Sequence, residues 1–396
     1  MSQEHDVVVL SAVRTPIGKY GGALKDMSPT ELGAAVVRES IQRSGIAPEE
    51  IEQVVFGNVI HTEPRDMYLS RVVAVRGGVP VEAPALTVNR LCGSGLQAIV
   101  SAAQTIQLGD TKAAIGGGAE CMSRAQYWIG GLRWGQRMNH GTVTDAMVGA
   151  LTDPFDDVHM AITAEAVAAK YGVSREDQDR LAVQSHLRAA EAIKHCLFKE
   201  QILPIPVKSR KETIMVDTDE GPRGDTTYEA LAKLKPVFDK NGSITAGNAS
   251  TVNDGAAAVV LMERAAAEER GLRPLARLAG YAVAGVDPKY MGTGPVPAVR
   301  RLLQKAQLDV EDIDVFEVNE AFAAQALAVS RELHLPEDKT NPNGSGISLG
   351  HPIGATGAIL TVKALYELQR VHGRYAVVTM CIGGGQGIAA LFESIN

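Results

Sequence analysis

The sequence repeats one pattern twice, and this repeat restricts the possible folds more than any other feature of the chain. Residues 35–56 (AVVRESIQRSGIAPEEIEQVVF) and 298–316 (AVRRLLQKAQLDVEDIDVF) each contain an amphipathic helix pattern, an acidic turn and an apolar strand pattern. A shift of 262 positions places Ile51 on Ile313. Because this period is far too long for a solenoid, we interpret the repeat as the duplication of one α/β domain.

The same shift places Gly95 on Gly357, and each of these glycines opens a helix pattern. Each helix is followed by a strand pattern that ends in glycines, at 113–118 in the first half and at 376–385 in the second. Strands that alternate with helices are typical of parallel sheets covered by helices. The sequence therefore predicts an α/β fold of two similar halves, with two mixed, mostly parallel sheets and helices in layers.

The region between the halves, 121–247, has a different character. It holds both tryptophans, charged irregular stretches and one clear helix pattern, at whose start Ser174 and Asp177 resemble a capping box. We expect an inserted loop domain that acts as a lid or substrate-binding subdomain, and then a strand within 243–263 that returns to the first half. The predicted boundaries are 1–120 with 248–272 for the N-terminal half, 121–247 for the insertion and 273–396 for the C-terminal half.

Charge and hydropathy exclude several classes of partner. The net charge of −7 is spread without any block of like charges, which argues against a nucleic-acid groove. No apolar run reaches the roughly 18–20 residues that span a bilayer, and the N-terminus lacks the pattern of a signal peptide. We therefore expect a cytoplasmic protein without membrane or nucleic-acid partners, in which the four cysteines are free thiols.

Cys92 is the first candidate for chemistry. A strand pattern, ALTVNRL, leads into CGSG and then into a helix pattern. A cysteine in such a turn lies at a helix N-terminus, where the helix dipole and free N–H groups favour a thiolate. The arrangement parallels the nucleophile elbow of hydrolases, with cysteine in place of serine. The alternative is a buried, inert cysteine, and the spacing alone does not decide between the two.

His351 precedes the helix pattern of the second half, near the place that matches Cys92 in the first half. If the duplicated halves meet face to face, these two turns come together. A histidine beside a thiol can accept its proton. The alternative is a turn histidine whose ring is satisfied by backbone groups.

Two further motifs follow strand patterns of the second half. Cys381 precedes a glycine-rich turn, which can offer backbone N–H groups to a developing oxyanion. A dinucleotide-binding turn is excluded, because only nine residues follow Gly387. Cys381 is otherwise a core cysteine at a strand end. Asn319 either caps the next helix or positions a water or a carbonyl with its amide.

We expect no metal site. The chain has no HExxH motif and no Walker-type phosphate loop, and His195 and Cys196 are neighbours on a helix and therefore point apart. A coenzyme A site fits these features better, because a helix N-terminus or a few basic groups can hold its phosphates.

Taken together and in order, the motifs NRLCGSGLQA, GNAS, NEAFA, GHPIGATGA and CIGGGQG resemble the thiolase family, and in particular the bacterial acetyl-CoA acetyltransferases and β-ketothiolases. The resemblance covers the whole chain, including VVVLSAVRTPIGKYGG near its start. It implies a duplicated thiolase fold and a ping-pong acyl transfer between coenzyme A thioesters. It also implies a homotetramer built as a dimer of dimers, and no cofactor beyond coenzyme A and acyl-CoA as substrates.

The resemblance implies a role for each catalytic position. Cys92 corresponds to the nucleophile that accepts the acyl group, and His351 to the histidine that activates it and helps to hold the thioester oxygen of the second substrate. Cys381 corresponds to the thiol that removes a proton from the α-carbon of that substrate. Asn319 corresponds to the residue that holds a water in the first oxyanion site. The backbone N–H groups of Cys92 and Gly383 correspond to the second oxyanion hole.

Binding residues follow from the same resemblance. Arg223 and Leu234 correspond to a loop that contacts the adenine-nucleotide end of coenzyme A, and Ala246 and Ser250 to positions along its pantetheine arm. The positions that correspond to the acyl pocket are Leu151, His159, Met160, Met291, Ala321 and Phe322.

The chain departs from the usual family pattern at four places. Ala161 and Thr251 stand where glycines are usual, and their added bulk leaves the preferred acyl length open. Arg223-Gly224-Asp225 stands where Arg-His-Gly is usual, so that Asp225 adds negative charge near a phosphate-bearing ligand. Cys121 stands where serine is usual, and we expect it to be a buried replacement.

Three alternatives stay open beside a short-chain acetyltransferase. The closest alternative is a thiolase for longer fatty 3-ketoacyl-CoA, although HMAITAE with Met160 favours the short-chain group. A decarboxylating ketoacyl synthase typically pairs its cysteine with two histidines or with a histidine and an asparagine, whereas this chain has Cys381 as the second centre. A non-catalytic acyl-CoA binding protein on the same fold would not need every catalytic position to be filled.

Overall fold

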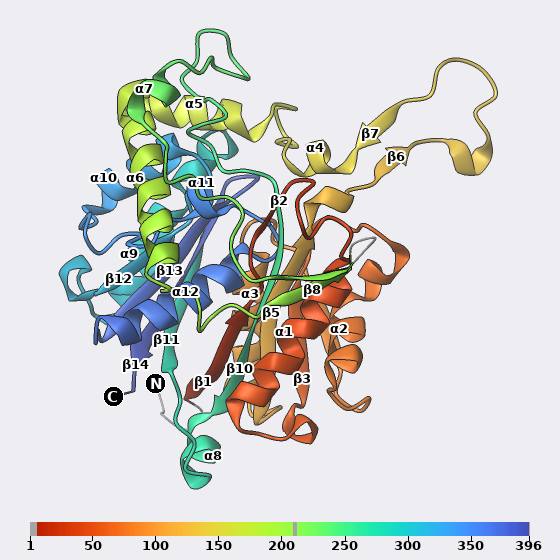
Figure 1. Cartoon of the computed structure of the whole chain (residues 1–396), viewed down its shortest axis with the longest axis vertical. Coiled ribbons are helices and arrows are strands. Elements are labelled where there is room, and N and C mark those ends of the chain that lie inside the picture. The colour runs from red at the N-terminus through yellow and green to blue at the C-terminus, as the bar shows by residue number, and fades with distance from the viewer. Residues whose placement is uncertain (1–5, 209–211, 396) are drawn as a thin grey trace.

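The computed structural model describes residues 6–208 and 212–395 (Figure 1). Residues 1–5, 209–211 and 396, which include the outer ends of the predicted N-terminal and C-terminal halves, lie outside the described residues. Among the described helices, none combines the length and the hydropathy needed to cross a membrane.

One ten-stranded sheet runs through both halves of the chain (Figure 1). The short strand β2 (Gly18–Lys19) pairs with β10 beside the main path. The spatial order of the other strands is β12 (Val315–Val318), β13 (Tyr375–Ile382), β14 (Gln386–Ser394), β11 (Ala276–Gly285), β1 (Val7–Arg14), β10 (Asn253–Glu263), β5 (Ala113–Cys121), β3 (Gln53–Gly57) and β4 (Ala85–Val88).

The two halves of the sheet have the same internal order, which confirms the duplication. In the first half, β3 is parallel to β5, and β5, β10 and β1 follow as antiparallel neighbours. In the second half, β12 is parallel to β13, and β13, β14 and β11 follow in the same way. The predicted return strand is therefore β10, which lies between β1 and β5.

The structure corrects two details of the predicted sheet. The two expected sheets are one, because β1 and β11 pair edge to edge through Val8↔Arg277 and Val9↔Ala276. Among the nine pairings described for this sheet, only three are parallel. A parallel neighbour needs a long crossover, whereas the three-residue turn 383–385 between β13 and β14 permits only an antiparallel pair.

Helices cover both faces of the sheet. On β1, Val7 and Val9 belong to the hydrophobic cluster that includes α3 (Ser94–Gln107) and α12 (Thr356–Arg370). The alternate residues Val8 and Leu10 face the cluster that includes α1 (Pro29–Ser44) and α2 (Leu69–Gly77). The remaining helices outside the insertion are α8 (Arg264–Glu269), α9 (Pro295–Ala306), α10 (Ala323–Leu333) and α11 (Gly346–Leu349).

Helices α3 and α12 meet at the two glycines that the repeat aligns. A Cβ atom added to Gly95 would lie 2.7 Å from Ala358 N, and one added to Gly357 would clash with Leu96 N. Only glycine lets the two backbones approach this closely. The turns that precede α3 and α12 carry Cys92 and His351, so this crossing brings the two motifs together, as the sequence predicts.

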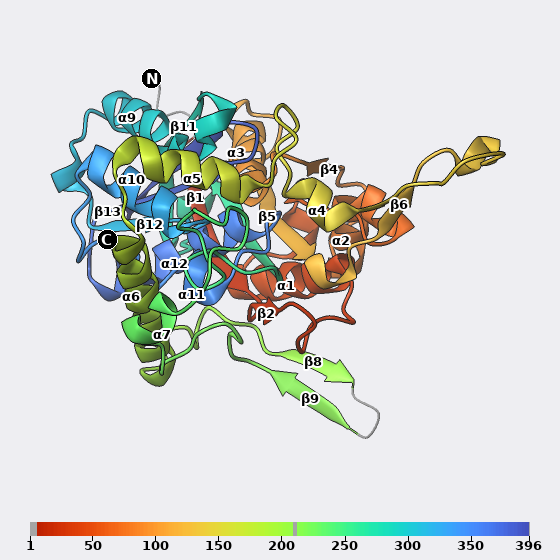
Figure 2. The same cartoon turned by 90° about the horizontal axis from the view of Figure 1, so that it is seen from above.

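In its described residues, the insertion adds four α-helices and two pairs of antiparallel strands. Helices α5 and α6 pack on α10 of the C-terminal half, and Ser174 caps α6 by accepting a hydrogen bond from Asp177 N (3.0 Å). The hairpin of β6 and β7 extends far from the body as an arm (Figure 2). The inserted elements are β6 (Tyr127–Ile129), β7 (Val143–Asp145), α4 (Ala146–Ala150), α5 (Met160–Tyr171), α6 (Arg175–Lys194), β8 (Ile205–Lys208), β9 (Thr213–Val216) and α7 (Tyr228–Ala232).

Candidate active site

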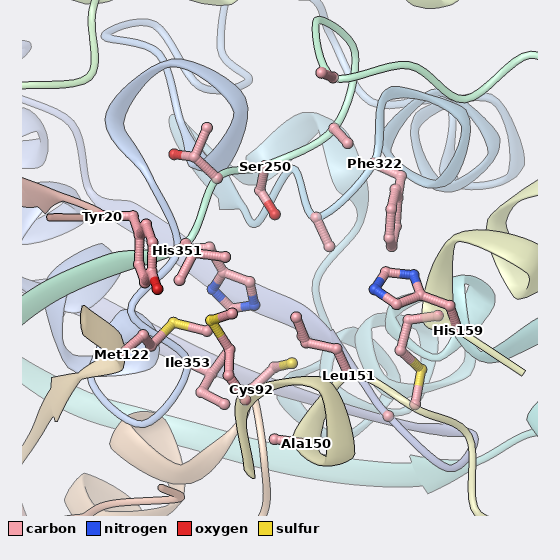
Figure 3. A pocket seen from close by; sticks show the side chains of 18 of the residues that line it. Tyr20, Cys92, Met122, Ala150, Leu151, His159, Ser250, Phe322, His351 and Ile353 are labelled. Carbon is pink, nitrogen blue, oxygen red and sulfur yellow. The ribbon is translucent and has the colours of Figure 1, made fainter. Parts of the chain in front are cut away.

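A cavity of about 580 Å³ lies where both halves and the insertion meet (Figure 3). Of the residues that the sequence assigns to the site, all but Asn319 and Leu234 line it. Figure 3 shows His351 directly above Cys92, with Leu151 and His159 to one side. The predicted residues on its wall are Cys92, Leu151, His159, Met160, Arg223, Ala246, Ser250, Met291, Ala321, Phe322, His351, Cys381 and Gly383.

Cys92 occupies a tight turn between β4 and α3. Leu91, the residue before it, has φ of 44°, a left-handed conformation that is strained for a side chain of this size. The hydroxyl of Ser94 holds the turn, because it accepts from Arg90 N (2.8 Å) and donates to Leu91 O (2.7 Å). A strained turn that presents a nucleophile at a helix start matches the elbow that the sequence predicts.

The thiol of Cys92 differs from the predicted thiolate. Burial raises the pKa of this thiol to about 11, although the backbone N–H groups of Gly383 and of Cys92 itself act in the opposite direction. Removal from water disfavours the charged form more than the N–H groups at the helix start favour it. The thiol of Cys92 is therefore neutral at rest, and it would need a base to react as a nucleophile.

His351 is buried and can act as that base. Its Nδ1 lies 2.6 Å from Thr356 Oγ1, and this hydroxyl donates its own hydrogen to Pro352 O (3.0 Å). Nδ1 must then carry the ring proton, so Nε2 is unprotonated and its lone pair can accept a proton or an N–H of Asn319. Burial lowers the pKa of His351 to about 4, so the ring is neutral at pH 7.

Asn319 follows β12 and is completely buried. It does not cap the next helix, because α10 begins at Ala323 with Phe322 in the cap position. Its Nδ2 lies 3.4 Å from His351 Nε2, and its Oδ1 has no hydrogen-bond partner among the described residues. The structure thus favours the second hypothesis for this residue, an amide that positions a small polar group beside His351.

Cys381 is the last residue but one of β13 and lines the same cavity. Burial and the nearby thiol of Cys92 both raise the pKa of its thiol. The turn after it is formed by three glycines, of which Gly384 and Gly385 have φ of 79° and 84°. This turn directs the N–H of Gly383 at the sulfur of Cys92. The cavity therefore contains two neutral thiols, and the backbone N–H groups of Gly383 and Cys92 point at one of them.

Three positioning contacts were not predicted from the sequence. Thr356, which fixes the tautomer of His351, lies five residues later in the quoted motif GHPIGATGA. Asn253 Oδ1 accepts the backbone N–H of His351 (2.9 Å). Glu120 accepts hydrogen bonds from Ile60 N (3.1 Å) on one side and Gly354 N (2.9 Å) on the other. Nothing in the spacing of a sequence shows such long-range hydrogen bonds.

Met160, His159 and Phe238 line one part of the cavity. Met160 lies directly beside the donor turn, since a Cβ atom on Gly383 would be 3.0 Å from its terminal methyl. The ring of His159 stacks on Phe238 at 4.0 Å, and its Nδ1 accepts from Ala161 N (3.1 Å). Phe238 also lines the cavity, although the sequence did not single it out.

The departures from the family pattern have distinct surroundings. Thr251 lines the cavity and donates to Asn253 Oδ1 (2.8 Å), whereas Ala161 is buried behind the wall. Asp225 lies close enough to His186 to oppose the lowering of its pKa by burial. Cys121 is fully buried at the end of β5, as expected. Leu234 lies outside the cavity and is partly exposed.

The geometry supports acyl transfer through a covalent thioester. A neutral thiol beside a neutral imidazole can react by passing its proton to the ring as it attacks a carbonyl. Backbone N–H groups beside the attacking sulfur can stabilise the oxyanion that forms. A second thiol across the same cavity provides another proton-transfer group, which acyl transfer to water would not require.

Comparisons with known proteins agree with this site. A model of the thiolase N-terminal domain matches residues 7–265, and a model of the thiolase C-terminal domain matches residues 272–394. The β-ketothiolase BktB of Cupriavidus necator is 64% identical over 391 residues, which are 98% of this chain and 99% of that protein.

Solved structures give the same result. The acetyl-CoA acetyltransferase of Bacillus anthracis superposes with a TM-score of 0.97 at 47% identity and covers 99% of both chains. Human mitochondrial 3-ketoacyl-CoA thiolase in complex with CoA superposes with a TM-score of 0.96 at 44% identity, over 100% of this chain and 99% of that one. The chain therefore belongs to the thiolase family.

Proposed function

We propose that this protein is an acetyl-CoA acetyltransferase with β-ketothiolase activity, which condenses two acyl-CoA molecules to a 3-ketoacyl-CoA and free CoA and also catalyses the reverse thiolysis. The observation that carries this proposal is the meeting of Cys92, His351 and Cys381 in one cavity, with the N–H of Gly383 directed at the sulfur of Cys92. The thiolase relatives support it, among them the β-ketothiolase of Cupriavidus necator.

In the first half-reaction, the sulfur of Cys92 attacks the thioester carbonyl of the first acyl-CoA and passes its proton to His351 Nε2. The N–H groups of Cys92 and Gly383 hold the oxyanion. The bond to the CoA sulfur then breaks, and the thiol of Cys381 gives its proton to that sulfur. The products are an acyl-enzyme, free CoA, an imidazolium and a thiolate at Cys381.

In the second half-reaction, the Cys381 thiolate removes a proton from the α-carbon of acetyl-CoA. The imidazolium of His351 and a water held by Asn319 stabilise the enolate oxygen. The enolate carbon attacks the acyl group on Cys92 and forms the new carbon–carbon bond. The Cys92 sulfur leaves and takes its proton back from His351, so every group returns to its resting state.

The acyl pocket supports a short chain. Its walls are apolar at Leu151, Met291 and Phe322, and Met160 lies beside Gly383, where its side chain would narrow the space next to the reacting carbonyl. The second candidate is a 3-ketoacyl-CoA thiolase for longer chains; the likeness to a human 3-ketoacyl-CoA thiolase supports activity on 3-ketoacyl-CoA. Rates of thiolysis of four-, six- and ten-carbon 3-ketoacyl-CoA distinguish the two, and a clear preference for ten carbons would refute the short-chain proposal.

We propose that coenzyme A and acyl-CoA are the substrates and that no further cofactor takes part. The pantetheine arm would pass Ala246 and Ser250, which line the cavity, and the nucleotide would lie near Arg223 at its mouth. Leu234 would contact the adenine end from outside the cavity. The human relative whose structure contains CoA supports this ligand. Cytoplasmic location stays a prediction.

We further propose that the protein forms a homotetramer, as a dimer of dimers. The arm of β6 and β7 supports self-association, because it extends away from the body (Figure 2) and exposes large apolar side chains. Trp134 and Met138 are 86% and 81% exposed. Exposed apolar groups gathered on one projection mark an interaction site more often than they mark a free surface.

A single-turnover experiment tests the proposed function. On mixing with acetyl-CoA, the protein should release one CoA per site and gain one acetyl group, which peptide mass spectrometry should place on Cys92. The absence of any acyl-enzyme would support a non-catalytic acyl-CoA binding protein. Failure to release CoA from acetyl-CoA, together with activity on malonyl thioesters, would support the decarboxylating synthase.

A further inference from the structure

Arg14 is the largest fully buried side chain in the described part of the chain. It ends β1 in the motif VRTPIGKYGG, which has no part in the reaction described above. Its guanidinium donates to both carboxylate oxygens of Asp219, at 2.7 and 2.9 Å, and to Gln201 Oε1 at 2.7 Å. Neither side chain of the Arg14–Asp219 pair is exposed to solvent.

A buried ion pair is weak evidence for stability, because the loss of hydration offsets most of the attraction. Its geometry, by contrast, is demanding: two parallel hydrogen bonds fix the orientation of both groups. The Arg14–Asp219 pair joins the first strand of the N-terminal half to a residue of the insertion, 205 positions later. The question is what this orientation holds in place.

The pair holds the loop 219–223 against the segment 17–23. Asp219 Oδ1 also accepts from Ile17 N (2.8 Å), and Glu220 N donates back to Ile17 O (3.0 Å). The carboxylate of Glu220 accepts from Lys19 N (3.0 Å) and Ala23 N (3.1 Å). Hydrogen bonds from the backbone and from side chains therefore both join the loop 219–223 to the segment 17–23, and the buried Arg14–Asp219 pair lies at one end of this contact.

The outer end of the loop is fixed as well. Arg223 N donates to His186 Nδ1 (3.2 Å). Gly221 packs so closely on the chain before His351 that an added Cβ atom would clash with Ser348 O. The loop is therefore held from the N-terminal half, from α6 and from the chain that leads into His351.

These two segments form the mouth of the active-site cavity. Lys19, Tyr20, Glu220, Gly221 and Arg223 all line it, and Figure 3 shows Tyr20 on the His351 side of the cavity. Among the described residues, neither Lys19 nor Arg223 forms a salt bridge. Two unpaired cations at the mouth of a cavity suit a ligand that brings phosphates, because they gain charge-assisted hydrogen bonds when it arrives.

We infer that Arg14 and Asp219 are positioning residues for the nucleotide end of coenzyme A. The buried pair sets the loop 219–223 against the segment 17–23, and so places Lys19 and Arg223 at the mouth before the substrate binds. This inference rests on the proposed function. Because the loop is already ordered in the free protein, binding does not have to pay the entropy of ordering it. Loss of the pair should therefore weaken the affinity for the nucleotide and leave the chemistry at Cys92 unchanged.

The test compares substrates with and without the nucleotide. For Asp219→Asn, we expect the KM for acetoacetyl-CoA and for CoA to rise about tenfold while kcat changes less than about twofold, because the lost interaction is with the bound substrate in all its states. With acetoacetyl-pantetheine, which lacks the nucleotide, KM and kcat should stay within about twofold of wild type. Inhibition by 3′-phosphoadenosine 5′-diphosphate should weaken in parallel with the KM for CoA.

Two further variants separate positioning from folding. Arg14→Lys keeps the buried positive charge but loses the two parallel hydrogen bonds to Asp219. It should therefore raise the KM for CoA as selectively as Asp219→Asn does. Its melting temperature should fall less than that of Asp219→Asn. Glu317→Gln removes an equally buried pair, with Lys363 (2.7 Å), that does not touch the loop. It should lower the melting temperature without changing the ratio of kcat/KM for the CoA and pantetheine substrates.

Two results would overturn the inference. One is an unchanged KM for CoA in a folded Asp219→Asn protein, and the other is an equal loss on both substrates, which would mean a structural role only. A wild-type protein that turns over neither thioester would refute the proposed function instead. In that case, titration calorimetry with 3′-phosphoadenosine 5′-diphosphate still reports whether Asp219→Asn weakens nucleotide binding.

Discussion

Cys92 and His351 are both uncharged at rest, because burial raises the pKa of the thiol to about 11 and lowers that of the imidazole to about 4. Below its pKa, the thiolate fraction rises about tenfold for each pH unit. We therefore expect the rate of Cys92 alkylation by iodoacetamide, without substrate, to rise steadily from pH 7 to pH 10. Peptide mass spectrometry measures it, with Cys196, an exposed thiol, as the internal comparison.

A plateau of the alkylation rate below pH 8 would contradict this, because it would indicate a thiolate–imidazolium pair at rest.

Acylation of Cys92 should depend on His351 as the base even though the resting pair is neutral. His351→Asn should slow acyl-enzyme formation from acetyl-CoA by about 10²- to 10⁴-fold, the usual contribution of a general base. An unaffected rate would remove His351 from the first half-reaction.

Cys381 should matter for one half-reaction more than for the other. A CoA thiolate can leave without a proton donor, whereas a proton on carbon does not leave without a base. In Cys381→Ala, we expect the acyl-enzyme on Cys92 to form while condensation falls by about 10²- to 10⁴-fold. Cys121→Ala is the matched control, because that thiol is equally buried but lies off the cavity and should affect neither step. Equal loss of both steps in Cys381→Ala would refute the division of roles.

The residues that we propose to carry the chemistry could be placed in one site from the sequence, and the residues that hold and tune them could not. Cys92, His351 and Cys381 lie in glycine-rich motifs that can be recognised directly in the sequence. The pKa of Cys92 depends instead on how much protein surrounds it, which overrides the local effect of the helix start. Asn253 and Glu120 act through hydrogen bonds to segments far away in the sequence, for which no local pattern exists.

At the scale of elements, the crossing of α3 and α12 sets the distance between the two halves of the site. Gly95→Ala and Gly357→Ala each place a methyl group against the backbone of the other helix. We expect each to lower the free energy of unfolding by about 1–3 kcal/mol, the usual effect of overpacking, and to lower kcat because Cys92 and His351 move apart. Urea unfolding and steady-state kinetics measure the two effects.

Gly280→Ala in β11 is the control for the glycine variants, since an added Cβ atom there would lie 3.4 Å from Leu302 Cδ1, an ordinary contact. A Gly357→Ala protein with wild-type stability and kcat would show that the helices can separate without harm to the site.

The repeat predicts which elements exist and in what order, and the aligned glycines even mark where two helices touch. It does not predict the direction of β14 or the joining of β1 to β11. These depend on the length of the turn at 383–385 and on two residue pairs at the sheet edge, neither of which alters the hydrophobic pattern.

At the scale of the whole molecule, the duplication explains why the site lies where it does. Each half supplies one turn that leads into a helix, with Cys92 before α3 and His351 before α12, and the close approach of these two helices brings the turns together. The insertion then closes the cavity with α4, α5 and the loop 219–223. No described residue of the β6–β7 arm lines the cavity, and we propose that a second copy covers its exposed side chains.

The arm therefore carries the prediction on assembly. Trp134→Ser combined with Met138→Ser removes the two most exposed apolar side chains of the arm, and a contact between copies loses most when such anchors are lost. We expect wild type to sediment as a tetramer and the double variant as a dimer at the same protein concentration. Ile214→Ser combined with Met215→Ser, on the other hairpin, is the matched control, because these side chains are also about half exposed or more. A tetramer that survives the loss of Trp134 and Met138 would show that the arm is not the contact, and a monomeric wild type would refute the tetramer itself.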